Sequence, residues 1–364
     1  GTYYKVDYSQ GVDISRYRKH RLHYNIMVTA DDETHRILWV ATAAGQQETV
    51  RARLTGNTGT DAADVAFESD GTALQATMTG DTWSITLPAM EAGAQRSIVA
   101  LSSTTGAILG KLDAIAYEPI GRKVNLVPVG STPAGLNAGD ILTALNNTYR
   151  QAVASWEVAV LDPLTVDGYT GTLQDDEQAL LSVYSTGMRE IIRAFEATGA
   201  VNEDEFYLFL VDRSQVGNTG YMPRKHRYGF IYMEDNPDVP RTVAHELGHG
   251  AFRLQHTFEE YPTIGGPRST ANLMDYGTGT KLRKYQWDLI HNPPLVIGLL
   301  EDEGEGALVS DTIFVAWAVD SLLVDESSNI QVQGANPLTS IGVVPTTGFV
   351  VVKDSEDSIW MVDN

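Results

Sequence analysis

The sequence predicts a multidomain protein: an N-terminal all-β sandwich (residues 1–120), an α/β (α+β) domain (121–297) and a short acidic β-rich C-terminal region (298–364). Three observations predict this order. Short alternating runs recur near the start, strands alternate with helices in the middle, and acidic residues gather at the end. At 364 residues, the chain can hold two or three domains that each bury a core.

The N-terminal region is predicted from five short runs of alternating polar and apolar residues. They are HYNIMVT, ETVRARL, ALQATMT, WSITL and RSIVALS, separated by clusters of Gly, Asp, Asn and Ser. This pattern is typical of an antiparallel sandwich or barrel. Its histidines, His20, His23 and His35, lack the spacing of metal ligands, so we expect them to be solvated.

The sequence of the middle region predicts an α/β domain, in which strands alternate with helices. KVNLVPVG, EFYLFLVDR and YGFIYME predict strands, with the last a candidate for the sheet edge. Helices are predicted over Gly139–Val160, opened by Asp140, and over Glu177–Ala197. A further helix is expected after Pro240.

Charge and cysteine usage exclude several classes of protein. The 26 Lys and Arg stand against 47 Asp and Glu, a net charge of -21 without a basic stripe, so no nucleic-acid partner is expected. The absence of Cys excludes disulfides and thiolate metal sites. The apolar run Ile313–Val324 is too short for a membrane span and predicts a buried strand.

The C-terminal region is strongly acidic. Residues 301–364 hold twelve acids and one base, Lys353, which gives 1 minus 12, or -11. Interleaved with FVAWAV, NIQVQG and GFVVVKD, these acids indicate either a solvated anionic face or a surface for a partner or calcium.

The chemistry of the chain is concentrated in HELGHGAFRLQH, residues 245–256. Residues four apart on a helix share a face, so His245 and His249 can direct imidazole nitrogens at one ion. Glu246 points about 100° further around the helix, where it can act as a general base toward a water on that ion. Gly248 and Gly250 leave room for another part of the chain to approach closely.

A catalytic zinc site normally takes a third protein ligand. The residues considered for this role are His256, Glu259, Glu260, Asp275 and His291. On a straight helix, His256 would lie about 10 Å beyond His249 along the axis, out of reach. It can therefore bind only if the helix ends after Gly250, within AFRLQ, and the chain folds back.

These residues resemble the motifs of the metzincin metallopeptidases, whose pattern is HExxHxxGxxH followed by a methionine-containing turn. HELGH matches, and STANLMDYG puts Met274 eighteen residues after His256. The sequence departs from the pattern because Phe252 stands at the turn glycine and the histidine spacing is seven rather than six. A different turn, with Gly250 a candidate for it, or an acidic third ligand, Glu259 or Glu260, would account for the departure.

A closer likeness is to metallopeptidase domains of polymorphic toxins and injected effectors of Bacteroidota. HELGHGAF, HTF, NLMDY and KYQWDLIHNP are similar to segments of those domains, including the longer histidine spacing. The two resemblances together cover approximately residues 123–294 and include a predicted closing helix in KLRKYQWDLIH and a cleft-rim strand in GYMPRKHRYGFIYME.

The resemblance implies a Zn²⁺ site with His245, His249 and His256 as ligands and Glu246 as general base. Tyr276 is implied either as an oxyanion donor or as a packed aromatic residue. We expect Met274 to form the floor under the imidazoles, as metzincin turns do. Asp275 is a candidate to orient a ligand histidine.

The implied function is a zinc-dependent endopeptidase acting on a protein or peptide substrate. The resemblance also implies a secreted or translocated bacterial effector, which would meet secretion or injection machinery through its N-terminal or C-terminal regions. No leader pattern opens the chain, so a removed leader, a longer parent chain or another export route all stay open. The alternatives are a binding or adhesion protein with a structural zinc site and a peptidase held latent.

A basic cluster stands out in this acidic chain: Arg224, Lys225, His226 and Arg227. A solvated surface is the simpler interpretation, particularly for His226. Attraction of acidic substrate segments or docking against the acidic C-terminal region are the other two interpretations.

Overall fold

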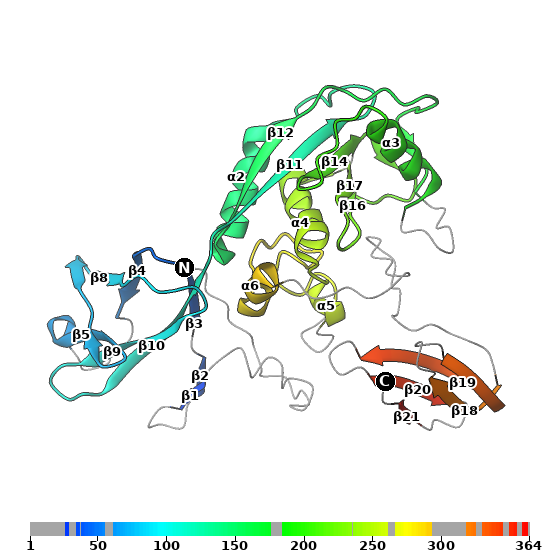
Figure 1. Ribbon diagram of the computed structural model, residues 1–364. Helices are drawn as coiled ribbons and strands as arrows, with labels where there is room; N and C mark the ends of the chain where they lie inside the picture. Colours follow the sequence, from blue (N-terminus) through cyan, green and yellow to red (C-terminus); the bar gives the residue numbers. More distant parts are fainter. Residues whose placement is uncertain are drawn as a thin grey trace.

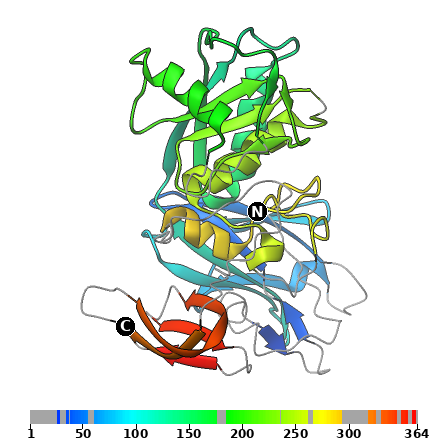
Figure 2. The same cartoon turned by 90° about the vertical axis from the view of Figure 1, so that its right-hand side faces the viewer.

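The computed structural model is a mixed α/β arrangement of several β-sheets and few helices (Figures 1 and 2). It describes residues 38–54, 61–175, 184–234, 236–260 and 266–292 with their side chains. For residues 26–28, 34–36, 318–324, 330–344, 349–354 and 359–362 it describes the strand backbone.

The N-terminal third consists of strands. β1 (Ile26–Val28) pairs with β2 (Thr34–Arg36). A five-stranded sheet has the order β3-β10-β9-β5-β6 and a three-stranded sheet the order β4-β8-β7. Their bounds are β3 Leu38–Ala43, β4 Glu48–Arg53, β5 Val65–Ser69, β6 Thr72–Ala73, β7 Ala76–Thr79, β8 Thr82–Leu87, β9 Gln95–Ser102 and β10 Ile108–Tyr117, with η1 at Ala62–Asp64.

The five- and three-stranded sheets share one apolar core, to which β8 contributes Trp83 and Ile85 and the larger sheet Phe67 and Ile98. The expected antiparallel pattern holds for every pair in these two sheets except β10 and β3, which run parallel. Strands so far apart in the chain need no tight turn between them, so sequence alternation could not reveal their direction.

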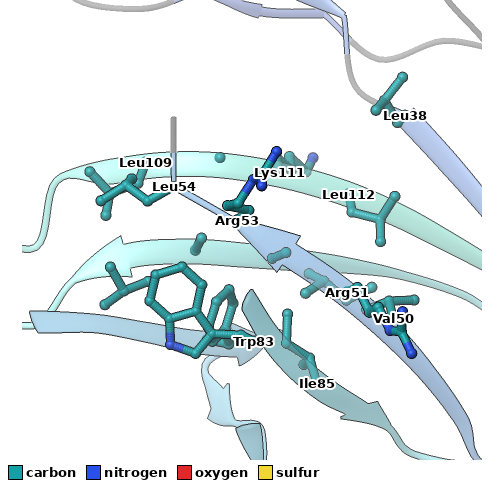
Figure 3. A pocket seen from close by; sticks show the side chains of 16 residues that line it. Leu38, Val50, Arg51, Arg53, Leu54, Trp83, Ile85, Leu109, Lys111 and Leu112 are labelled. Atoms are coloured by element: carbon teal, nitrogen blue, oxygen red, sulfur yellow. The ribbon is translucent and has the colours of Figure 1, made fainter. Parts of the chain in front are cut away.

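A cavity of about 310 Å³ opens between these two sheets (Figure 3). Its walls are mainly apolar, with Trp83 and Ile85 on one side and Leu109 and Leu112 among the other lining residues. Its charged lining residues are Arg51, Arg53 and Lys111, and it contains no histidine or carboxylate. It therefore offers no ligands for a hard or borderline metal ion.

The central sheet has the order β12-β11-β14-β17-β16, in which only β16 runs antiparallel to its neighbour. The bounds are β11 Ile120–Pro128, β12 Ala154–Val160, β14 Phe206–Val211, β16 Gly220–Tyr221 and β17 Tyr228–Tyr232. β17 was a candidate for the sheet edge, but it lies between β14 and β16. The two-residue β16 forms that edge, and so short a strand leaves no periodic pattern in the sequence.

Helices cover both faces of the central sheet. Leu208 and Leu210 of β14 face the core shared with α2 (Ala138–Tyr149), α4 (Val239–Phe252) and α6 (Lys284–His291). Tyr207, Phe209 and Val211 face α3 (Thr186–Glu196) on the other side. Because both faces are buried, the strand is a continuous apolar run, FYLFLV.

Two predicted helices have different bounds in the structure. The helix expected over 139–160 ends at Tyr149, and η2 (Arg150–Ala152) and a left-handed Val153 lead into β12. Asn137 caps this helix rather than Asp140. The helix expected over 177–197 is found as α3, capped by Ser185, and residues 176–183 lie outside the described residues.

The remaining elements are small, apart from the C-terminal sheet. β13 (Thr172–Leu173) pairs with β15 (Arg213–Ser214), and α5 spans Thr257–Glu260. At the C-terminus, shown red in Figure 1, β18 (Ala318–Val324), β19 (Ile330–Val344), β20 (Phe349–Asp354) and β21 (Ile359–Val362) form an antiparallel sheet. No helix in the described part of the chain is long and apolar enough to cross a membrane.

Aromatic and charged groups join α6 to the N-terminal strands. The Tyr117 ring stacks on His291 with ring centroids 4.2 Å apart, and the Tyr117 hydroxyl donates to Asp288 Oδ1 at 2.6 Å. Lys284 Nζ lies 5.1 Å from the centroid of the Trp39 ring. Trp39 and Tyr117 thus belong to the same core as α4 and α6.

Candidate metal centre

Helix α4 carries the first half of the motif and is buried along most of its length. It begins where the Asp238 side chain accepts a hydrogen bond from the Arg241 N–H, with Pro240 in the first turn, as helix starts favour. His245, Glu246 and His249 are each at most 1% exposed. The sequence therefore folds this charged and polar turn into the protein interior, where such groups require partners.

The chain turns back after α4 at a left-handed residue, Arg253, with φ 59° and ψ 26°. The Arg253 N–H donates to His249 O at 2.9 Å and the Leu254 N–H to Gly248 O at 3.0 Å, which closes the helix. His249 and His256 are seven residues apart, one more than in the metzincin pattern. The helix accommodates the additional residue by continuing to Phe252. Gly250, the candidate for the turn, lies inside the helix instead.

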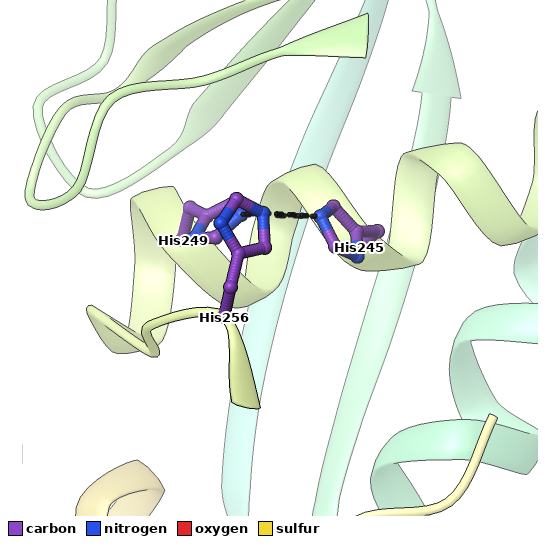
Figure 4. A group of neighbouring side chains, drawn as sticks. All are labelled: His245, His249 and His256. Atoms are coloured by element: carbon purple, nitrogen blue, oxygen red, sulfur yellow. Dashed lines mark hydrogen bonds between the residues drawn. The ribbon is translucent and has the colours of Figure 1, made fainter. Parts of the chain in front are cut away.

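The turn brings His256 to the two helix histidines (Figure 4). The Nε2 atom of His256 lies 3.2 Å from that of His245 and 3.1 Å from that of His249, and those two are 3.2 Å apart. Zn–N bonds of about 2.0–2.1 Å in tetrahedral geometry place ligand nitrogens about 3.3 Å apart. The three buried side chains are therefore close enough to hold one metal ion.

Two of the three imidazoles donate a hydrogen bond from the outer nitrogen, Nδ1, to a backbone carbonyl oxygen. His245 Nδ1 donates to Leu273 O at 2.8 Å and His249 Nδ1 to Leu254 O at 2.7 Å. His256 Nδ1 faces Glu259 Oε2 at 3.2 Å. Because a carbonyl oxygen only accepts, Nδ1 of His245 and of His249 is the donor, and Nε2 is the ring nitrogen that faces the other two histidines.

Glu259 was an alternative to His256 as third ligand. The structure instead places its carboxylate on the far side of the His256 ring, where it can orient the ring and raise its basicity. The sequence analysis did not predict this role for Glu259. The signal that could have predicted it is the position of the carboxylate, three residues after His256 on a short helix.

Burial lowers the pKa of both His245 and His256 well below its usual value, and the neighbouring His249 lowers both further. Arg241 adds to the effect at His245, and Arg224 adds to it at His256. The two imidazoles are therefore neutral at ordinary pH, the protonation state in which histidine binds metals.

The loop with Met274 lies directly under α4. A Cβ atom built on Gly248 would come within 2.6 Å of Met274 Sδ, so only glycine admits this approach. Met274 O accepts from the Thr257 N–H at 2.9 Å, which ties the loop to the residue after His256. Met274 is fully buried against Gly248, the residue before His249, and its role as a floor under the imidazoles stays a prediction.

Asp275 does not orient a histidine, contrary to the sequence-based expectation. Its carboxylate accepts from the backbone N–H groups of Arg268 at 2.6 Å, Thr270 at 2.7 Å and Tyr276 at 2.7 Å. A carboxylate so placed satisfies the turns of its own loop, a role open to any Asp in a tight loop.

Glu246 lies against the edge of the central sheet. A Cβ atom built on Gly220 of β16 would stand 2.6 Å from Glu246 Oε1 and 2.7 Å from Thr242 Cγ2. Burial raises the pKa of Tyr149 and of Tyr232 well above the usual value, and the nearby Glu246 raises both further. The Glu246 carboxylate thus projects its charge into a buried space between α4 and β16.

Tyr276 packs its ring beside the histidines. Its centroid is 4.8 Å from that of His256 in an edge-to-face arrangement and 5.0 Å from that of Phe258. It is thus both near the candidate metal position and part of an aromatic group, so the two interpretations of its role remain compatible with the structure.

Two other histidines lie apart from the group of three. His291 stacks on Tyr117 and its Nε2 donates to Ala152 O at 2.6 Å. The His226 ring is half-buried, meets Tyr184 edge to face at 5.4 Å and has a pKa that burial lowers, so it is only partly solvated. Neither residue belongs to the candidate metal site.

Comparison with known proteins adds no functional argument. No family model matches the chain, and no curated protein matches it. Among solved structures, a 2,6-sialyltransferase from Photobacterium sp. JT-ISH-224 is similar over 50% of this chain and 36% of its own, at 10% identity and a TM-score of 0.20. A GH5 xyloglucanase from Bacteroides ovatus covers 65% of this chain and 53% of its own, at 12% identity and a TM-score of 0.18. The chain thus spans about a third and about half of these two proteins.

Proposed function

We propose that the protein is a zinc-dependent endopeptidase whose catalytic domain, residues 121–297, is metzincin-like. The observation that carries the proposal is the convergence of three imidazole Nε2 atoms within 3.2 Å of one another, with a buried glutamate on the same helix. Histidine nitrogens in this arrangement suit Zn²⁺, and three protein ligands are typical of catalytic rather than structural zinc.

His245, His249 and His256 would hold the zinc ion through Nε2. Leu273 O and Leu254 O fix the rings of His245 and His249 from behind, and the Glu259 carboxylate lies 3.2 Å from Nδ1 of His256. Bound there, zinc would supply Lewis acidity and lower the pKa of a water molecule toward neutrality. Glu246 accepts the proton of the attacking water and delivers it to the amine of the leaving group.

The substrate would be an extended protein or peptide segment. Among the described strands β16 pairs only with β17, so its other side can accept the backbone of a peptide as an added strand. Gly220 lies in β16 and contacts the region of Glu246, so a peptide on this edge would pass the proposed general base.

Tyr276 would assist from the opposite side of the histidines. Its ring lies 4.8 Å from the His256 ring, near enough for its hydroxyl to donate to a developing oxyanion after a small rotation. Replacement by Phe separates this role from packing, because Phe retains the ring.

The resemblance to toxin and effector metallopeptidases supports a further part of the proposal. On that ground the protein is a secreted or translocated bacterial effector, delivered through contacts of its N-terminal or C-terminal regions. The competing function is a binding or adhesion protein that uses zinc structurally, or a latent peptidase.

Zinc content and cleavage of a peptide library test the proposal directly. We expect the wild type to bind one zinc ion and to cleave peptides, while Glu246→Ala binds zinc without cleaving. Zinc binding without cleavage by the wild type would favour the structural or latent alternative, and absence of zinc binding would exclude both zinc functions.

A further inference from the structure

A second cavity, of about 590 Å³, lies beside the histidines and opens toward solvent. Three segments line it: the loop Val216–Thr219 before β16, residues 237–242 at the start of α4, and Tyr276–Thr278 after the Met274 loop. Arg268 completes the lining. None of the sequence motifs pointed to this space.

The cavity begins next to the proposed catalytic groups. Thr242 lines the cavity one turn before Glu246, and both side chains flank the same point beside Gly220. On the opposite wall, Tyr276 lines the cavity and also contacts the His256 ring. A substrate side chain adjacent to the scissile bond can therefore enter this space while its backbone lies on β16.

Positive charge predominates on the cavity wall, although the chain as a whole has a net charge of -21. The charged lining residues are Arg241, Arg268 and Asp238. Arg241 donates to the carbonyl oxygens of Gly279, Leu273 and Asp275, and these neutral partners leave its positive charge in place. One oxygen of the Asp238 carboxylate caps the start of α4, where it accepts a hydrogen bond from the Arg241 N–H at 3.1 Å.

Arg268 is the cationic group that a ligand can reach. It is exposed, and no hydrogen bond or ion pair of its guanidinium occurs within the described part of the chain. Its backbone is fixed by the bond from its N–H to Asp275 Oδ1 at 2.6 Å and lies against Gly277, another lining residue. The side chain thus starts from an anchored position at the cavity wall.

We propose that this cavity selects substrates with an acidic side chain next to the scissile bond, recognised by the Arg268 guanidinium. The proposal rests on the peptidase function proposed above. The Glu246 carboxylate lies outside this lining, next to Thr242, and repels an acidic group, which keeps that group toward Arg268. Arginine matches a carboxylate with two parallel donors, whereas a basic substrate side chain would meet two guanidinium groups.

The test uses the zinc-loaded full chain. A peptide library analysed by mass spectrometry first locates the flanking position with the strongest preference, and two peptides that differ only by Glu or Gln at that position are then compared. We expect the wild type to cleave the Glu peptide with a kcat/KM roughly three- to tenfold higher, mainly through KM, because one exposed charged contact contributes modestly. The advantage should shrink in high salt.

Variants assign the preference to Arg268. Arg268→Gln should bring the Glu and Gln peptides to equal rates. Arg268→Glu should favour a Lys peptide instead. Arg193→Gln, which removes an exposed arginine of α3 that does not line the cavity, should keep the wild-type preference.

The possible failures are distinguishable. Peptide cleavage by the wild type at equal rates for Glu and Gln would overturn the acidic preference alone, as would a preference that survives in Arg268→Gln. Zinc-loaded wild type that cleaves no peptide would remove the proposed function, and the specificity with it.

Discussion

Arg241 and His245, one turn apart on α4, donate hydrogen bonds to the same oxygen, Leu273 O, at 3.0 and 2.8 Å. The Arg241 guanidinium also donates to Asp275 O at 2.5 Å and Gly279 O at 3.0 Å. One side chain therefore fastens the Met274 loop to the helix and fixes the acceptor that orients a candidate metal ligand.

Replacement of Arg241 by Gln should lower the free energy of unfolding by about 2–4 kcal/mol, since carbonyl groups lose charged donors in a part-buried loop. Zinc affinity should fall as well, because Leu273 O is no longer held for His245. Urea denaturation and competition with a chelator measure the two effects. Arg193→Gln is the control, and equal denaturation midpoints for the two variants would contradict the fastening role.

The left-handed turn at Arg253 predicts a different response to two substitutions. Arg253→Gly should leave zinc content and thermal midpoint nearly unchanged, because glycine adopts a positive φ without steric cost. Arg253→Val should cost about 2 kcal/mol or more, since β-branched side chains tolerate this region worst. Thermal unfolding and metal analysis give both readouts. A valine variant as stable as the glycine variant would show that the turn does not need this conformation.

Loss of the carboxylate behind His256 should weaken zinc binding without abolishing it. We expect about a 10–100-fold lower zinc affinity for Glu259→Gln, the usual range for removal of such a partner. His256→Ala should lose the ion outright. Glu190→Gln, which removes an exposed carboxylate of α3, serves as the matched control in titrations against a zinc indicator. If Glu259→Gln lost zinc as completely as His256→Ala, Glu259 would be a ligand itself.

Gly220 gives a way to displace Glu246 without changing it. Gly220→Ala introduces a Cβ atom 2.6 Å from Glu246 Oε1 and 2.9 Å from Glu246 Cγ, so the glutamate side chain must shift. We expect kcat to fall about 100-fold or more, the scale of a misplaced general base, while zinc content stays near that of the wild type. Gly121→Ala, in β11 and with no atom near its Cβ position, controls for a changed glycine. Unchanged kcat in Gly220→Ala would argue against Glu246 as the base.

His291 should make stability depend on pH. Burial lowers its pKa, outweighing the opposite effects of the Ala152 carbonyl and Asp288, whereas the unfolded chain has a value of about 6.5. Below about pH 6.5 the unfolded state binds the proton more readily, so this contribution to stability is present above that pH and is lost as the pH falls. His291→Phe keeps a ring against Tyr117 and does not titrate. Its unfolding free energy should fall less steeply than that of the wild type between about pH 7 and pH 5.5, and equal slopes would refute this assignment.

The helix bearing HELGH and the central strands could be predicted because their apolar patterns reflect burial on a helix or on both sheet faces. Helix geometry also showed correctly that His256 needs a helix end within AFRLQ. The residue at which the helix ends could not be predicted. The turn has Arg253 in the left-handed conformation, which is normally predicted from a glycine in the sequence.

The partners around the histidines were harder to foresee. Asp275 follows Met274 directly, so the sequence suggested a role at the metal. Its carboxylate instead accepts hydrogen bonds from N–H groups of its own loop. Arg241 contacts Leu273, which lies far away in the sequence, and Glu259 contacts His256 within a single turn of α5. Neither contact produces a periodic pattern in the sequence. The end predicted for the helix over 139–160 was wrong. This stretch has apolar residues throughout, and the left-handed Val153 that interrupts it leaves no mark in that pattern.

Two of the three imidazoles are oriented by main-chain oxygens, those of Leu254 and Leu273, rather than by side chains. Every amino acid supplies such an oxygen, so mutation at these two positions cannot delete the acceptor. Both leucines are also fully buried in the core that contains α4, so their side chains support the fold while their carbonyl oxygens orient the rings. Insertions and deletions between residues 249 and 274 would displace these oxygens, so we expect the length of this segment to tolerate little change.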